Sequence, residues 1–280
     1  MDNLLEISNG QRIDRGSIPH LPFDSFREEL IQLANQGGNV VQFFAYIDNG
    51  QSKLLAVLRN AQNDTLYVTG CDVDDTFLSL TLVSRKFHMF EREIAEQYGL
   101  KPNDHPWLKM VRYHPNYSRK PDLFGNNYDH DIPGNYPYFT VEGETVHEVA
   151  VGPVHAGIIE PGHFRFQCVG ERVFHLEIQL GYQHRSVERL LQSVPAKRLP
   201  IIAETIAGDT TTGHNLCHCQ AIESLADLTV DDGARIVRTI ALELERLANH
   251  IGDLGALSHD VAFNPPAEYY GRIRGEYLNL

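Results

Sequence analysis

The fold of the N-terminal part of the chain depends on residues 39–69, which read NVVQFFAYIDNGQSKLLAVLRNAQNDTLYVT. Three runs rich in aliphatic, β-branched and aromatic residues, 39–47, 53–58 and 65–69, are separated by short polar segments. Such runs predict β-strands. The first break holds Asp48-Asn49-Gly50, and Asn-Gly between two apolar runs is a strong hairpin signal. We therefore expect antiparallel strands here.

Two amphipathic helices are predicted on either side of these strands. In residues 23–35, Phe26, Leu30 and Leu33 recur at helical spacing, and residues 87–98 also carry apolar side chains three or four positions apart. Gly99 follows the second helix, where a glycine commonly ends a helix. Strands and helices in this order predict a small N-terminal α+β domain with one apolar core.

The second half of the chain predicts a β-hairpin followed by a helical bundle. Residues 164–169 and 172–178 read as two strands that meet at Gly170-Glu171. Residues 234–257 carry a long apolar stripe at helical spacing, which favours a bundle core, and Asp231 or Asp232 can cap this helix. Residues 267–280 also read as a helix, and we interpret this last helix as part of an incomplete bundle.

Between these two parts, residues 113–140 carry prolines, glycines, asparagines and seven aromatic residues. This composition predicts an extended segment that packs against a surface, and a disordered tether is the alternative. The expected domain organisation is an N-terminal domain over 1–112, a linker over 113–145 and a second domain over 146–280.

The composition excludes several classes of partner. The 280 residues include 24 lysines and arginines against 37 aspartates and glutamates, a net charge of −13. Nucleic acid and anionic membrane surfaces are therefore not expected as direct partners. No apolar run approaches the ~20 residues that a transmembrane helix needs, and the N-terminus has no secretory signal pattern. Four irregularly spaced cysteines and no signal favour a reducing cytoplasm.

Several short motifs stand out in the two halves of the chain. In residues 87–109 they are Glu91-Arg92-Glu93, Gly99-Leu100 and His105-Pro106-Trp107-Leu108. In residues 150–274 they are Gly152-Pro153-Val154-His155, Glu160-Pro161-Gly162-His163-Phe164-Arg165, Gly181-Tyr182-Gln183-His184-Arg185 with Glu188, and Leu244-Glu245-Arg246-Leu247 with Asn249-His250.

Taken together, these motifs resemble two related families. Residues 87–109 resemble the 30-kDa-type subunit of respiratory complex I. Residues 150–274 resemble the 49-kDa-type subunit and its relative, the large subunit of membrane-bound nickel-iron hydrogenases. This order, over roughly residues 40–280, resembles the large subunit of formate-hydrogenlyase-type hydrogenases.

The chain departs from the hydrogenases where their first pair of metal-binding cysteines stands. The family pattern there is E-R-x-C-G-x-C, whose thiolates suit nickel and iron. Residues 204–210 read ETIAGDT, so Ala207 and Thr210 occupy the two cysteine positions. The second pair would lie beyond the last residue given. Gly208 stands where complex I has a quinone-bonding tyrosine. We therefore expect no nickel-iron centre, and the resemblance predicts no cofactor in this chain.

The resemblance also suggests two groups of site residues. His155 and His163, flanked by Glu160 and Arg165, occupy the place of the complex I loop that reaches the quinone headgroup, so they are candidates for handling protons or quinone. A structural loop whose histidines bond to the backbone is the alternative. A second group is expected to cross-link the bundle and to line the contact with an iron-sulfur subunit, although solvated helix faces are possible for it: His184, Arg185, Glu188, Glu245, Arg246 and His250.

The functional hypothesis is a subunit of a hydrogenase-like or NADH:quinone oxidoreductase-like electron-transfer complex. It would dock an iron-sulfur small subunit that carries the cluster, with quinone or NADH used by the complex, and it would contact membrane subunits indirectly at the cytoplasmic face. One alternative is a non-catalytic assembly or scaffold protein. A third is an independent metalloprotein that uses His214, Cys217 and His218, which share a helix face, whereas Cys219 does not.

Overall fold

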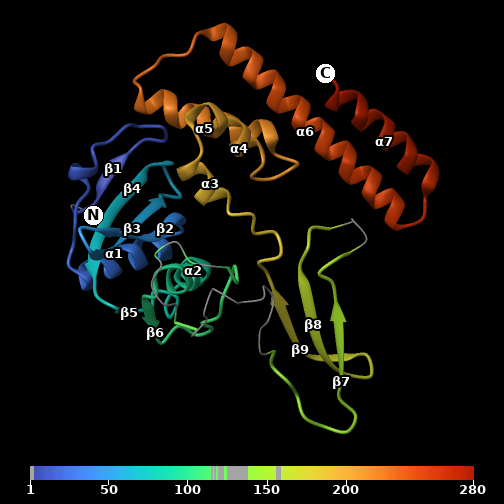
Figure 1. Ribbon diagram of the computed structural model, residues 1–280, viewed down its shortest axis with the longest axis horizontal. Helices are drawn as coiled ribbons and strands as arrows, with labels where there is room; N and C mark the ends of the chain where they lie inside the picture. Colours follow the sequence, from blue (N-terminus) through green and yellow to red (C-terminus); the bar gives the residue numbers. More distant parts are fainter. Residues whose placement is uncertain (1–2, 115, 117, 119–122, 125–137, 156–158) are drawn as a thin grey trace. The chain divides into compact units, whose positions relative to one another are not determined.

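The computed structural model describes residues 3–114, 116, 118, 123–124, 138–155 and 159–280 (Figure 1). Contacts divide the chain into two compact units, Met1–His184 and Arg185–Leu280. The mixture of antiparallel sheets and helices agrees with the expected α+β class. The break between the units falls later than the expected linker, most of which lies outside the described residues. The domain boundaries 1–112, 113–145 and 146–280 remain predictions.

The first unit begins with an antiparallel sheet whose four described strands run in the order β1-β4-β3-β2. The Asn-Gly hairpin signal is confirmed, because Asn49 (φ 49°) and Gly50 (φ 81°) both have the positive φ of a type I′ turn between β2 and β3. The strands are β1 (Leu5–Ile7), β2 (Asn39–Asp48), β3 (Gln51–Arg59) and β4 (Leu66–Val73).

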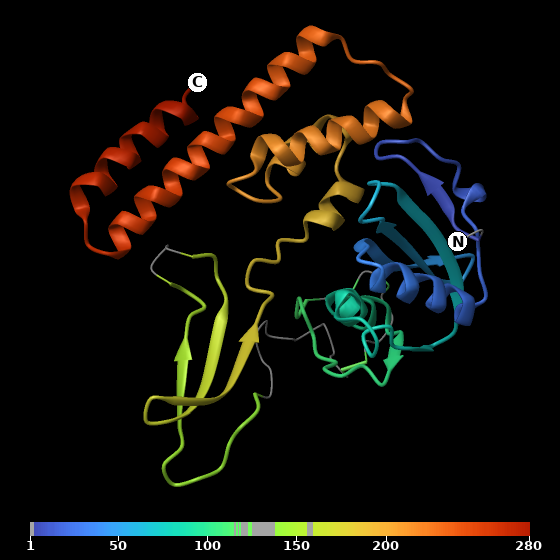
Figure 2. The same cartoon turned by 180° about the vertical axis from the view of Figure 1, so that it is seen from behind.

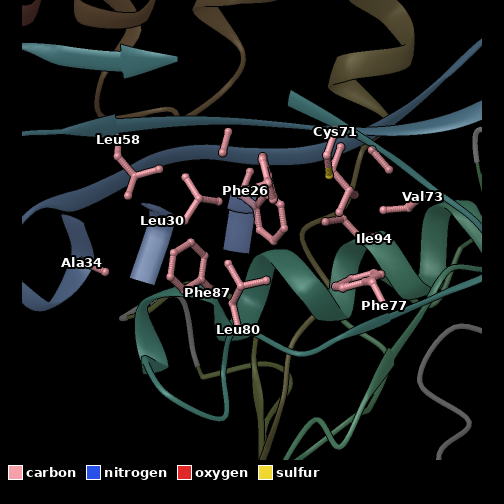
Figure 3. Close-up of a cluster of buried hydrophobic side chains, with 14 of the residues drawn as sticks. Phe26, Leu30, Ala34, Leu58, Cys71, Val73, Phe77, Leu80, Phe87 and Ile94 are labelled. Atoms are coloured by element: carbon pink, nitrogen blue, oxygen red, sulfur yellow. The ribbon is translucent and has the colours of Figure 1, made fainter. Parts of the chain in front are cut away.

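Two helices cover one face of this sheet and close a core with it (Figure 3). They are α1 (Phe23–Asn35) and α2 (His88–Tyr98), close to the expected ranges. Phe26 from α1, Phe43 from β2 and Phe87 beside α2 are each at most 1% exposed, and Phe43 and Phe87 meet edge to face. Gly99 ends α2 in the left-handed conformation, as expected. The remaining elements here are the 3₁₀ helices η1 (Arg15–Ser17) and η2 (Arg85–Phe87) and the parallel pair β5 (Thr76–Leu78) and β6 (Lys101–Asn103).

Helix α2 also buries charged side chains that hold two neighbouring segments. The Glu91 carboxylate accepts hydrogen bonds from the hydroxyls of Ser79 and Thr81 and from the Leu80 N–H. Arg92 donates to the carbonyl oxygens of residues 109 and 110 at 2.7 and 2.8 Å. Glu96 accepts from the backbone N–H groups of residues 111, 112 and 113. These bonds fix the path of residues 109–113 against the helix.

The rest of the first unit is a second antiparallel sheet in the order β7-β8-β9 (Figures 1 and 2). Strands β8 (His163–Val169) and β9 (Arg172–Gln179) form the expected hairpin. The sequence did not predict β7 (His147–Val151), which pairs with β8 as a third strand. All five residues of β7 are exposed, and its run is short and carries His147 and Glu148, so no clear strand pattern marks it.

The second unit is entirely helical in its described residues. Asp231 caps α6 as expected, because its carboxylate accepts from the Ala234 N–H. Ala203 and Ala248 are the residues of this described unit that reach full burial, so these helices enclose no large apolar core of their own. The elements are α3 (Val187–Ser193), η3 (Ala196–Arg198), α4 (Leu199–Glu204), α5 (Thr211–Leu225), α6 (Asp232–Asp260) and α7 (Asn264–Leu278).

Helices α6 and α7 lie side by side in both views (Figures 1 and 2). Two glycines of α6 allow this approach: a β-carbon at Gly255 would lie 3.3 Å from the Tyr270 β-carbon, and one at Gly252 would lie 3.1 Å from the Arg274 side chain. In the described part of the chain, no helix combines the length and the apolar character needed to span a membrane.

Replacing Glu96 by glutamine is expected to destabilise the first unit by about 2–3 kcal/mol, because an amide N–H₂ would then face backbone N–H donors in a buried site. Glu93→Gln on the same helix is the control. Its partner Arg112, at 2.7 Å, lies in a partly exposed ion pair, so the loss should stay below about 1 kcal/mol. Urea unfolding of both variants measures the difference, and equal losses would contradict the assigned role of Glu96.

Candidate functional site

The candidate loop before β8 is closed by two histidine side chains that bond to the backbone. His155 Nε2 lies 2.7 Å from the Gly162 carbonyl oxygen, and His163 Nδ1 lies 3.1 Å from the Gly152 carbonyl oxygen. Since a carbonyl oxygen can only accept, the nitrogen that contacts it in each ring carries the proton: Nε2 in His155 and Nδ1 in His163. Both histidines therefore bond to the backbone, which is the arrangement expected of a structural loop. Glu160 is exposed, and residues 156–158 lie outside the described part of the chain.

Gly152 is required at the base of this loop for two reasons. Its φ of 79° lies in the left-handed region that suits glycine. A β-carbon there would also overlap the Gly162 carbonyl oxygen and the His155 ring. The glycine therefore lets the two ends of the loop approach closely.

The β7–β9 sheet has an unusual distribution of polarity. Its polar face is buried: Glu177 and Gln179 are 3% and 0% exposed. On the opposite face, Phe174, Leu176 and Ile178 of the same strand are 53%, 42% and 39% exposed. An antiparallel sheet with one solvated face normally shows the reverse. The sheet therefore presents apolar side chains outward and keeps its hydrogen-bonding side chains inside the unit.

A buried ion pair joins the polar face to the N-terminal body. Lys109 Nζ lies 2.8 Å from Glu177 Oε1, and the two side chains are 2% and 4% exposed. The other carboxylate oxygen of Glu177 accepts from the Phe139 N–H at 2.9 Å. The Lys109 ammonium also lies 5.0 Å from the centre of the Trp107 ring, a cation–π contact. Burial lowers the pKa of Lys109 below its ordinary value, and the hydrogen bond to Glu177 opposes this shift. Burial alone would raise the pKa of Glu177, but the hydrogen bonds from Lys109 and Phe139 bring this pKa below its ordinary value.

Further polar contacts surround the sequence-predicted Arg165. It forms an ion pair with Glu148 of β7, and its guanidinium lies 4.4 Å from the centre of the Tyr138 ring. The same ring lies 5.4 Å from the His163 ring. Burial, together with the electrostatic effect of the neighbouring Tyr182 side chain, raises the pKa of Tyr138 to about 12, so its phenol stays protonated. His163 and Arg165 are thus brought together around Tyr138, a residue that the sequence did not single out.

In the second unit, the turn at residues 205–213, which includes Ala207 and Thr210, is held by polar side chains. Arg185 donates to the carbonyl oxygens of Thr205 and Ile206 at 2.6 and 3.0 Å. Asn249 donates to the Asp209 carbonyl oxygen at 2.5 Å. Glu245 accepts from the N–H groups at the start of α5, at 2.6 Å from residue 212. A carboxylate at a helix N-terminus is favourable, so these contacts stabilise the turn.

The nickel-iron centre of the hydrogenases does not fit these residues. Ala207 has no ligand atom, and the Thr210 hydroxyl lies 3.2 Å from the Asp209 carboxylate. The described residues contain no group of three or more histidine, cysteine or acidic side chains arranged to hold a metal ion. That statement covers His214, Cys217 and His218 on α5. His214 instead lies 2.8 Å from the Thr210 carbonyl oxygen through its Nδ1.

The other predicted contact residues have separate surroundings. Arg246 pairs with Glu243 on its own helix, and both are exposed, so Arg246 does not cross-link helices here. His250 and Glu188 are exposed. His184 belongs to the first unit and packs against His114, with ring centroids 4.5 Å apart. Of the predicted cross-links, Arg185 and Glu245 join different segments of the helical unit.

Sequence reasoning missed the buried polar residues Lys109, Glu177 and Gln179. A signal was present in the last six residues of β9, FHLEIQ (174–179), in which polar residues take every second position. Alternation identifies two faces but does not tell which one is buried. Lys109 closes the stretch that resembles the complex I subunit, and nothing in its local pattern marks it as buried.

Comparisons with known proteins confirm the expected resemblance. No family model matches the chain. Similar proteins include hydrogenase-4 component G of Escherichia coli K12, 26% identical over 205 residues that cover 68% of this chain and 36% of that protein. Formate hydrogenlyase subunit 5 of the same strain is 27% identical over 203 residues, covering 68% and 35%. An NADH-quinone oxidoreductase subunit of Dehalococcoides mccartyi is 34% identical over 140 residues, covering 46% and 36%.

These relatives are subunits or components of hydrogenases and of NADH-quinone oxidoreductases, so the chain is similar to proteins of this oxidoreductase class. It spans little more than a third of their length, with shares of 36%, 35% and 36%.

Gly152→Ala is expected to destabilise the first unit by about 3 kcal/mol, because the new methyl group adds a clash to the cost of a left-handed alanine. Gly170→Ala is the matched control: its φ is also positive, 56°, but no atom lies within 4 Å of its β-carbon position. It should cost about 1–2 kcal/mol. Chemical unfolding compares the two. A smaller loss for Gly152→Ala would contradict the close approach.

The Glu177 carboxylate should make stability depend on pH. Because its pKa is lower in the folded chain, its contribution is complete above the ordinary glutamate value of about 4.3 and is lost as the pH falls through the folded value. Glu177→Gln should remove that acid-side dependence and cost about 3 kcal/mol at pH 7, since it breaks a buried ion pair by removing one of its two charges. Glu171→Gln, at an exposed turn, is the control for unfolding curves from pH 3 to 7. An unchanged profile would exclude this role.

Proposed function

We propose that the chain is a docking subunit of a hydrogenase-like or NADH:quinone oxidoreductase-like electron-transfer complex, and that it binds an iron-sulfur subunit. The proposal rests on an apolar helical surface that the described unit leaves uncovered. On α6, Ile236, Ile240 and Leu257 are 60%, 54% and 63% exposed. Contiguous exposed apolar surface of this kind marks interaction sites, and covering it contributes roughly 25 cal/mol per Å².

The names of the relatives support this direction. They are called subunits or components of hydrogenases and of NADH-quinone oxidoreductases, and one further relative from Pyrococcus furiosus is named membrane-bound hydrogenase subunit alpha. We infer that this chain works at the cytoplasmic face of the membrane and attaches there through partner subunits. Electrons would pass through the iron-sulfur cluster of the partner, and quinone or NADH would be used elsewhere in the complex.

Within this proposal, the chain contributes a structural framework to the complex and does not bind a catalytic metal. Arg185, Glu245 and Asn249 hold the turn at residues 205–213, where the resembling hydrogenases bind their metals. The loop with His155 and His163 remains a candidate for handling protons or quinone. A neutral histidine with one bonded ring nitrogen can still exchange a proton at the other. The non-catalytic scaffold is the second candidate, and the missing thiolates at positions 207 and 210 favour it.

Co-expression with a hydrogenase-type iron-sulfur subunit tests the proposal. Alone, the chain is expected to self-associate through α6, whereas the co-expressed pair should form a defined complex in light scattering across a concentration series. Ile240→Glu should weaken capture of the partner at least tenfold, because a charge would be buried at the interface. Thr239→Glu, also exposed on α6, is the control and should leave capture unchanged.

A chain that stays monomeric at high concentration and captures no iron-sulfur subunit would refute the docking role. A stable complex that shows no quinone-linked or hydrogen-linked turnover would favour the scaffold over an electron-transfer component.

A further inference from the structure

Four buried hydrogen-bonding atoms without a partner lie together on the polar face of the β7–β9 sheet. They are His163 Nε2, Arg165 Nε and both amide atoms of Gln179. The His163 and Gln179 residues are 7% and 0% exposed, so bulk water does not satisfy them. Buried polar groups are almost always hydrogen-bonded, because an unmade bond leaves the full desolvation cost of the group. A cluster of four such atoms therefore indicates a binding site.

Strand register explains why these atoms converge. His163 of β8 and Gln179 of β9 are direct cross-strand partners, and Arg165 lies two residues further along the same face of β8. The Tyr138 ring packs against both His163 and Arg165. The paired strands fix the positions of all three side chains, and the Tyr138 ring further restricts His163 and Arg165.

The donor and acceptor roles define the chemistry of the ligand. Since His163 Nδ1 donates to the Gly152 carbonyl oxygen, its Nε2 is an acceptor in the neutral ring. Arg165 Nε–H and the Gln179 N–H₂ are donors, and Gln179 Oε1 is a second acceptor. A ligand must therefore both accept and donate hydrogen bonds. A hydroxyl group does both through one oxygen.

The surrounding charges indicate that this ligand is neutral. The Arg165 guanidinium is already paired with Glu148, and the neighbouring Glu177 is paired with Lys109. An added ion would enter a buried site without an opposite charge of its own, which is costly. A neutral group meets no such penalty.

We propose that His163, Arg165 and Gln179 form a buried site for a neutral hydroxyl group, supplied by an internal water molecule or by a small organic alcohol or phenol. The site lies at the end of the loop that begins at Gly152, so an occupied site would brace that loop from the sheet side. This binding needs no redox partner. Its evidence and its test are independent of the docking role, because they involve the β7–β9 sheet and not α6.

The site can be tested by whether the melting temperature falls or rises when Gln179 is replaced by an apolar residue. Gln179→Leu should lower the melting temperature of the full chain by roughly 2–4 °C, because the bound hydroxyl loses partners. Gln167→Leu is the matched control on β8. Gln167 is also buried, but its amide nitrogen already donates to Glu148 at 2.6 Å, so its loss must destabilise. If the Gln179 atoms hold nothing, Gln179→Leu removes an unpaired polar group and raises the melting temperature, which would overturn the proposal.

Spectroscopy on the unmutated full chain covers the case in which a variant fails to fold. Nuclear Overhauser contacts from the Gln179 amide protons to a resonance at the water frequency would identify internal water. Contacts to organic protons, with an alcohol or phenol recovered by mass spectrometry from the denatured chain, would identify an organic hydroxyl. Nitrogen-15 shifts should show His163 Nε2 unprotonated and hydrogen-bonded. No contact from either source, with a histidine shift typical of an unbonded nitrogen, would refute the site.

Discussion

The buried ion pair between Lys109 and Glu177 is the contact on which the arrangement of the first unit depends. Lys109 belongs to a segment that α2 holds through Arg92 and Glu96, and Glu177 belongs to the middle of β9. The pair therefore couples the N-terminal sheet and its helices to the β7–β9 sheet. Its geometry is constrained at both ends, because the Phe139 N–H and the Trp107 ring also contact it. A buried pair held this tightly specifies one orientation of the sheet, although it adds little net stability compared with apolar packing.

This constraint has a consequence for the other face of the sheet. Once the polar face is turned toward Lys109, the alternation of β9 directs Phe174, Leu176 and Ile178 outward. The helical unit likewise leaves much of the apolar stripe of α6 uncovered. Both observations support the docking role that we propose for this chain. Both regions therefore differ from the N-terminal body, whose core around Phe26, Phe43 and Phe87 is closed by its own helices.

The turn at residues 205–213 is held by side chains that bond to its backbone atoms. Arg185, Glu245 and Asn249 bond to backbone atoms of this turn, so none of these contacts requires a particular side chain at 207 or 210. Backbone-directed bonds tolerate substitution of the side chains they surround. The local fold can thus persist with alanine and threonine where thiolates would be needed for a metal.

The sequence by itself determined the elements that rest on local patterns. The Asn49-Gly50 turn, the range of α1, the glycine at the end of α2 and the Asp231 cap follow from neighbouring residues, and the motifs carried the resemblance to hydrogenase and complex I subunits. Only the tertiary structure decided which face of the β7–β9 sheet is buried, which charges pair, and that β7 joins the sheet. Those outcomes depend on partners distant in sequence, such as Lys109 and Glu177, 68 residues apart. Periodicity records two faces of a strand, and burial of one of them is a property of what packs against it.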